Sequence, residues 1–146
     1  MASPELTLRI TRTIQAPREK VFRAWTSPEE LKRWFGPEGV TCPEAEVDLR
    51  PGGRYRIAFL EPEGDTVRVG GIFQEVRFPE KLVYTWEWES GGSAGMGETL
   101  VTVKFRDQEG ATELTLTHER FPNKDTRDHH GWGWNSTLDC LDEHLA

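Results

Sequence analysis

Beyond residue 36 the sequence alternates apolar and polar residues with a period of two through six successive segments. Because successive side chains of a strand point to opposite faces of a sheet, this alternation predicts strands that bury one face. The segments span 45–49, 54–59, 66–76, 81–88, 98–105 and 112–121. Two glycines within "VGGIF" predict a bulge or sharp bend in the third segment. Short turns join the segments, so we predict an antiparallel meander that is strongly curved or nearly closed.

The chain before this meander shows a different pattern. "LTLRITRTI" at 6–14 alternates like a half-buried strand, whereas "APREKVFRAWTSPEELKRWF" repeats apolar residues at helical spacing. Pro17 suits a first helical turn, and Ser27-Pro28 followed by Glu30 is typical of a cap at which a second helix begins. We therefore expect one strand and two short helices ahead of the six strands.

The closing segment at 125–145 predicts a long amphipathic helix that lies on the sheet. Its apolar residues recur four, three and four positions apart, which places them on one stripe of a helix. The stripe consists of Trp134, Leu138, Leu141 and Leu145. In this register His130 lies at the edge of the stripe, while His129 and Trp132 point away from it and from any cavity beneath it.

The two adjacent histidines of this helix do not predict a metal site. His129 and His130 point about 100° apart, so they cannot chelate one ion as residues four apart can. Cys42 and Cys140 lie far apart in the sequence and form no chelating pair. The sequence also contains no phosphate-binding loop and no dinucleotide fingerprint. We expect a protein that folds without a metal and uses no cofactor.

The charge and composition of the chain exclude several classes of protein. A net charge of −7 argues against a nucleic-acid binder, which needs a basic surface for the phosphates. No apolar run approaches the ~20 residues that span a bilayer, and we expect no signal peptide in the first residues, which lack a basic segment followed by an apolar one. We expect a cytoplasmic protein with reduced cysteines, folded as a single domain over residues 1–146.

Five stretches follow one another along nearly the whole chain: "APREKVFRAWTSPEELKRWFGP", "VDLRPGGRYRI", "GGIFQEVRFPEKLVYTWEW", "LTLTHERF" and "GWNSTLDCLDEHL". Together they resemble the Aha1-C-like family (activator of Hsp90 ATPase homologue 1-like) of the START-like or SRPBCC superfamily. The resemblance implies a helix-grip fold, in which a curved antiparallel sheet wraps around a long C-terminal helix and leaves a cavity. The order of elements predicts the same α+β architecture with about seven strands. The helix pair after the first strand argues against the alternative of a lipocalin-like barrel.

The resemblance also implies a function. Members of the superfamily bind lipids, polyketides and other apolar molecules, so we expect a binding protein for a small apolar or aromatic ligand. Two alternatives stay open. One is a cofactor-free enzyme that uses His118 or His130 for proton transfer, and the other is a co-chaperone-like module that exposes an apolar patch. The sequence identifies no protein partner.

Aromatic residues at inward positions of the sheet and the helix form the candidate ligand site. Large rings line either a core or a pocket, and the chain has six tryptophans and seven phenylalanines. The candidate ligand-binding residues are Trp34, Phe35, Tyr55, Phe59, Trp86, His118, His130 and Trp134. We expect Trp34 and Phe35 at the entrance, because rims move most easily. Each inward histidine can be a satisfied core group, a ligand contact or an acid–base catalyst.

Overall fold

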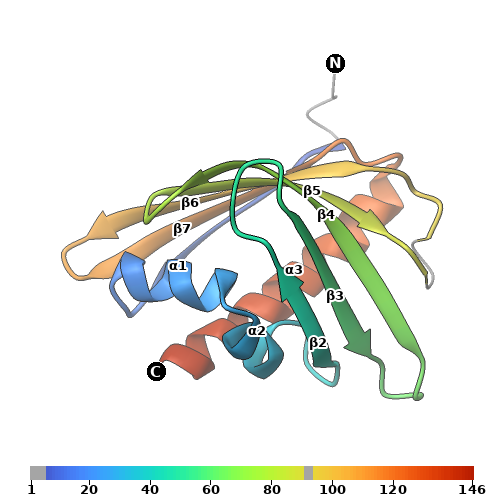
Figure 1. Cartoon of the computed structure of the whole chain (residues 1–146), viewed down its shortest axis with the longest axis horizontal. Helices are drawn as coiled ribbons and strands as arrows, with labels where there is room; N and C mark the ends of the chain where they lie inside the picture. The colour runs from blue at the N-terminus through green and yellow to red at the C-terminus, as the bar shows by residue number, and fades with distance from the viewer. Residues whose placement is uncertain (1–5, 91–93) are drawn as a thin grey trace.

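The computed structural model describes residues 6–90 and 94–146, which form a curved sheet and three helices (Figure 1). The elements are β1 (Leu8–Ile14), α1 (Arg18–Thr26), α2 (Pro28–Trp34), β2 (Thr41–Val47), β3 (Arg54–Leu60), β4 (Thr66–Arg77), β5 (Lys81–Trp88), β6 (Thr99–Gln108), β7 (Ala111–Glu119) and α3 (Lys124–Leu145). This order of one strand, two helices, six strands and one helix confirms the predicted order.

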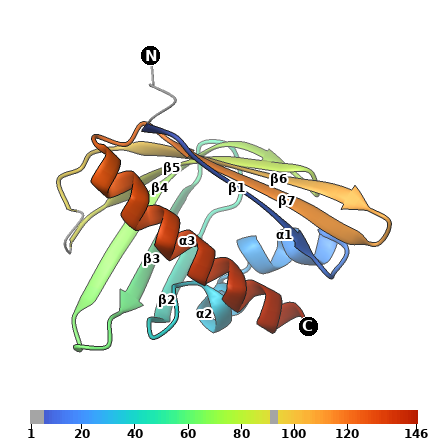
Figure 2. The ribbon, with the colours of Figure 1, turned by 180° about the vertical axis from the view of Figure 1, so that it is seen from behind.

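The seven strands form one antiparallel sheet with the order β1-β7-β6-β5-β4-β3-β2. Each strand from β2 to β7 pairs with its neighbour in sequence, as a meander requires, and β1 joins the sheet beside β7. The sheet arches over the helices, and β2, β3 and β4 curl down along one side (Figures 1 and 2). The predicted α+β helix-grip architecture is therefore confirmed.

β2 departs furthest from its predicted bounds, because it begins at Thr41 rather than residue 45 and ends at Val47 rather than residue 49. It is an edge strand that pairs only with β3. Pro43 has no N–H to donate, and an edge strand tolerates this because one of its sides has no neighbouring strand to bond. The pairing with β3 shifts register between Thr41 and Glu44, on either side of this proline.

α3 lies along the concave side of the sheet, where its apolar stripe is buried (Figure 2). The Asn123 side chain caps its first turn by accepting a hydrogen bond from the Thr126 backbone N–H at 2.8 Å. The buried residues of α3 are His130, Gly131, Trp134, Thr137, Leu138, Leu141 and Leu145. This set contains the whole predicted stripe, so the amphipathic register is confirmed.

The predicted cap between α1 and α2 is correct in position but not in contact. Ser27 is the N-cap residue of α2, yet its side chain makes no capping hydrogen bond. Glu30 turns toward α3 instead, where its Oε1 lies 3.0 Å from His144 Nε2. The acidic residue that suggested a capping box therefore ties α2 to the last turn of α3.

Tryptophan rings join α1 and α2 to the rest of the core. Trp25 stacks on Trp134 of α3 with ring centroids 6.1 Å apart. Its indole Nε1 donates a hydrogen bond to the Tyr84 hydroxyl of β5 at 3.1 Å. Trp34 donates from Nε1 to the Ala24 carbonyl at 2.9 Å. Burial of these large rings stabilises the layer, and the hydrogen bonds fix how they are oriented.

Gly71 of β4 lies where the backbone of β5 comes closest. A methyl group added at this position would lie 2.0 Å from the Thr85 carbonyl oxygen, so only glycine fits here. The same carbonyl accepts a hydrogen bond from the Tyr55 hydroxyl. The paired glycines predicted a bulge or bend, and β4 does shift register, between Phe73 and Glu75.

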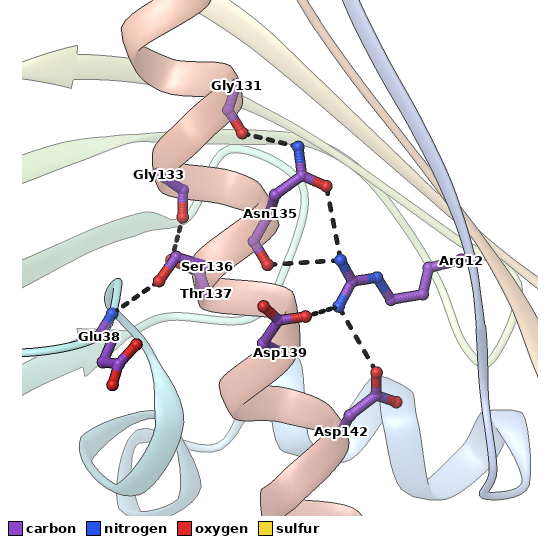
Figure 3. Close-up of polar contacts among 9 residues, drawn as sticks. All are labelled: Arg12, Glu38, Gly131, Gly133, Asn135, Ser136, Thr137, Asp139 and Asp142. Carbon is purple, nitrogen blue, oxygen red and sulfur yellow. Dashed lines mark hydrogen bonds and ion pairs between the residues drawn. The ribbon is translucent and has the colours of Figure 1, made fainter.

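Arg12 links β1 to the side of α3 that faces this strand (Figure 3). Its guanidinium forms ion pairs with Asp139 and, at 3.5 Å, with Asp142. It also donates to the backbone and side-chain oxygens of Asn135, both at 3.4 Å. One cation of the first strand thus holds two successive turns of the last helix.

Replacing Arg12 with methionine is expected to lower the free energy of unfolding by roughly 0.5–1 kcal/mol, because the pairs are partly exposed. Urea unfolding in low salt and in concentrated NaCl measures this loss. The difference from wild type should shrink in salt, which screens exposed charges. Arg106→Met is the matched control, since Arg106 pairs with Glu113 at 3.6 Å and is 78% exposed. A salt-independent loss would instead show that Arg12 acts through packing of its alkyl chain.

Candidate ligand-binding site

A pocket of about 660 Å³ lies between the sheet and the N-terminal half of α3. β3, β4 and β5 supply one wall and α3 supplies the other, while the loop after α2 completes the edge. The larger apolar residues that line it are Phe35, Val40, Phe59, Val67, Trp86, Trp88, Trp132 and Trp134. Ring contacts hold this wall together, with Phe35 stacked on Phe59 at 5.7 Å and Trp86 against Trp134 at 5.1 Å.

A hydrogen bond from a backbone N–H to a serine side chain attaches the loop after α2 to the helix. The Glu38 N–H donates to Ser136 Oγ at 2.8 Å (Figure 3). Gly36, which starts this loop, has a φ of +123°, a conformation that side chains rarely adopt. The contact with α3 therefore holds the middle of this loop, two residues after the turn at Gly36.

The structure brings together a subset of the residues predicted for the site. The predicted residues that line the pocket are Phe35, Phe59, Trp86, His130 and Trp134. Trp34, Tyr55 and His118 are buried behind or beside it. Trp34 borders a second, smaller pocket together with Cys42 and Cys140. Tyr55 packs against Phe73 and Tyr84 and donates its hydroxyl hydrogen to the Thr85 carbonyl.

His118 is completely buried, and both of its ring nitrogens have partners. Trp134 Nε1 lies 3.0 Å from His118 Nδ1. An indole N–H can only donate, so Nδ1 carries no proton and the neutral ring has its proton on Nε2. Nε2 lies 2.7 Å from Thr99 Oγ1, which in turn donates to the Trp86 carbonyl. Hydrogen bonding therefore favours the satisfied core group among the three roles considered for His118.

His130 has a similar arrangement but borders the pocket. Trp88 Nε1 donates to its Nε2 at 2.8 Å, and its Nδ1 lies 2.9 Å from the Thr126 carbonyl. A carbonyl only accepts, so the proton is on Nδ1 and the ring is neutral. Burial lowers the pKa of this imidazole, although the contact with Thr126 raises it in part. Protonation of Nε2 would break the bond to Trp88.

Acid is expected to destabilise the fold through these two histidines. Burial lowers the pKa of both imidazoles below the ordinary value of 6.5. The pKa of His118 is lowered strongly, mainly by burial and to a smaller extent by the nearby His130. Below pH 6.5 the unfolded chain therefore binds more protons than the folded one. The free energy of unfolding should be highest above this pH and fall as the pH drops toward the folded-state pKa values. Each histidine contributes at most about 1.4 kcal/mol to this loss per pH step of one. Urea unfolding at several pH values measures the loss.

His130→Gln is the control for the acid effect. Glutamine does not titrate in this range, and its side-chain oxygen can still accept a hydrogen bond from Trp88. The variant should lose less stability in acid than wild type does. The loss that remains should be the part caused by His118. An identical loss in both proteins would show that His130 makes no contribution.

Apart from His130, the polar side chains at the pocket were not predicted from the sequence. They include Glu38, Glu61, Glu63, Ser90 and Asp125. Most lie in turns or at element ends, where no periodic pattern marks the direction of a side chain. The one signal in the sequence is that some of them lie close to predicted inward residues, as Glu61 does two residues after Phe59.

His129 and Trp132 occupy a different place from the one predicted. Both are exposed, as the helical register indicated, and Trp132 is 62% exposed. Both nevertheless line the pocket, so the prediction that they point away from any cavity was wrong. The register correctly separated buried from exposed residues of α3. It could not show that the pocket extends past the edge of the stripe, because that depends on where β3 and β4 curl.

Among the described residues, no group of three or more His, Cys, Asp or Glu side chains is placed to hold a metal ion. None of the described helices has the length and apolar character needed to cross a membrane.

Comparison with known proteins identifies relatives of this chain. A crystal structure from Chromobacterium violaceum is 29% identical with a TM-score of 0.87, and the match covers 96% of both chains. A Nitrosomonas europaea protein is 27% identical with a TM-score of 0.82, over 98% of this chain and 96% of the other. The AHSA1 protein of Silicibacter pomeroyi is 26% identical with a TM-score of 0.84, over 95% and 96%. No curated protein matches.

The family model described as activator of Hsp90 ATPase homolog 1-like protein matches residues 15–146. This match includes every helix and every strand except β1. The chain therefore belongs to the family of activator of Hsp90 ATPase homolog 1-like proteins.

Proposed function

We propose that the protein binds a small apolar or aromatic molecule in the pocket between the sheet and α3. The observation that carries this proposal is the pocket itself, which has a volume of about 660 Å³ and a wall of aromatic rings. Sites for small molecules typically measure about 300–1,000 Å³ and combine such walls with a few polar groups. The START-like fold of the family commonly binds ligands, which supports the same function.

The hydrogen bonds of the two inward histidines favour binding over proton transfer. A general base needs a nitrogen that is free to take a proton from a substrate. Each ring nitrogen of His118 and His130 already contacts a protein group. No observation favours the enzyme or the co-chaperone-like module over a binding protein.

A filling substitution tests the site. Val67 lines the pocket, and Ile72 lies on the same strand outside it. Val67→Trp should weaken the binding of an aromatic probe such as fluorenone at least about tenfold, because the larger ring occupies the space that the probe needs. Ile72→Trp adds a ring to an exposed position of β4 and should leave the Kd unchanged.

Titration followed by two-dimensional NMR gives the Kd values and maps the binding site. In wild type, resonances of Phe59 and Trp134 should shift, while those of Phe22 and Phe105, buried in the core outside the pocket, should not. Binding to Val67→Trp with wild-type affinity would contradict the proposed site, as would shifts confined to the second pocket.

A further inference from the structure

Trp86 differs in its hydrogen bonding from the other buried tryptophans and from the partly buried Trp88. The indole nitrogens of Trp25, Trp34, Trp88 and Trp134 each donate to a protein acceptor at 2.8–3.1 Å. Trp86 Nε1 is buried and has no acceptor within residues 6–90 and 94–146, although its ring is only 4% exposed. It is the one buried side-chain donor or acceptor of the described chain that is left unsatisfied.

The imidazole acceptors in the cluster of rings around Trp86 are already occupied. Its ring contacts those of His118 and Trp88. His118 Nδ1 accepts from Trp134, and His130 Nε2 accepts from Trp88. A buried N–H without a partner is costly, and native proteins rarely retain one without a reason. Trp86 also lines the pocket, so a molecule bound there can supply the missing acceptor.

The charges of the pocket limit what that molecule can be. Four carboxylate side chains line it, those of Glu38, Glu61, Glu63 and Asp125. No lysine or arginine of the described residues lines the pocket beside them. An anion entering the pocket would meet repulsion from these carboxylates, whereas a neutral or cationic molecule would not.

Building on the proposed function, we propose that the ligand is an aromatic molecule without negative charge, whose carbonyl-type oxygen accepts a hydrogen bond from Trp86 Nε1. The aromatic body packs against Phe35, Phe59 and Trp88. Trp86 Nε1 is buried, so the rings around it must shift slightly for the oxygen to reach the indole N–H from the pocket. Uncharged aromatic ketones and quinones have this combination of flat ring and acceptor.

A matched pair of probes tests the hydrogen bond. Fluorene and 9-fluorenone have the same ring system, but only fluorenone has a carbonyl oxygen. Wild type should bind fluorenone about tenfold more tightly than fluorene, which is the effect of one typical hydrogen bond. Trp86→Phe keeps an aromatic ring and removes the N–H, so it should bind both probes with the affinity that wild type has for fluorene.

The indole resonance of Trp86 provides a second measurement that needs no variant. In the wild-type NMR spectrum this N–H signal should move strongly downfield with fluorenone and only slightly with fluorene. If Trp86→Phe does not fold, the shift of the wild-type indole N–H signal is sufficient to test the hydrogen bond. Equal affinity for both probes, or equal shifts, would overturn the role of Trp86 while leaving the pocket as a binding site. Failure of both probes to bind would overturn the proposed function as well.

A third probe tests the charge. The anion 9-fluorenone-2-carboxylate should bind at least about threefold more weakly than fluorenone, because it enters beside the four carboxylates. Addition of NaCl should reduce this difference by screening. Equal or tighter binding of the carboxylate would show that the ligand class includes anions and would overturn this part of the proposal.

Discussion

Replacing Trp134 with alanine is expected to lower the free energy of unfolding by about 3–5 kcal/mol. Trp134 is 4% exposed and lies where α1, α3 and the sheet meet. Its ring contacts Trp25, Phe35 and Trp86, and its Nε1 donates to His118. Alanine would leave a large cavity and an unsatisfied buried imidazole, and both effects reduce stability. Guanidinium chloride unfolding at neutral pH measures the difference.

Trp132→Ala is the matched control for this substitution. Trp132 lies on the same helix, two residues earlier, and is 62% exposed. Its loss should change the free energy of unfolding by less than about 1 kcal/mol. If Trp134→Ala costs no more than this control, α3 does not depend on Trp134 for its packing.

Replacing Gly71 with alanine is expected to cost about 3 kcal/mol, an effect of overpacking rather than of a cavity. The added methyl group would lie 2.0 Å from the Thr85 carbonyl oxygen, so β4 and β5 must move apart. The movement would also strain two hydrogen bonds of Thr85, one from the Tyr55 hydroxyl and one from the Ile72 backbone N–H. Thermal unfolding and urea titration both measure the loss.

Gly133→Ala adds the same methyl group at an open position. No atom lies within 4 Å of the new group, and the residue is in the middle of α3. Alanine favours a helix over glycine by about 1 kcal/mol, so this variant should be as stable as wild type or more so. Unchanged stability of Gly71→Ala would mean that the contact with β5 relaxes without cost.

The fold could be predicted from the sequence because its signals are local and repeated. The alternation along β3 and β5, and the stripe of Trp134 and Leu138, each follow from a few neighbouring residues. The bounds of β2 could not be predicted in the same way. Its pairing around Pro43 depends on its position at the edge of the sheet, which is a property of the assembled strands.

The candidate site could be predicted only in part, for a related reason. The alternation of apolar and polar residues along a strand indicates which side chains face inward. The inward side chains Phe59, Trp86, Tyr55 and His118 are all buried. The alternation does not indicate whether the space beyond the side chain is filled. Phe59 and Trp86 line the pocket, whereas Tyr55 and His118 meet other side chains. That difference arises from the curvature of the sheet and from pairings between residues that are distant in the sequence.

The pairing of β1 with β7 has a consequence for how the chain assembles. Leu8 lies opposite His118, so this contact joins residues that are far apart in the sequence. The strands from β2 to β7 can form as successive hairpins, each of which closes a short loop, whereas β1 must wait for its partner. During synthesis on the ribosome β1 is made before β7 and stays an unpaired strand until β7 follows. Its alternating Arg9, Thr11 and Thr13 keep one of its faces polar, which limits contact with other nascent chains during that interval.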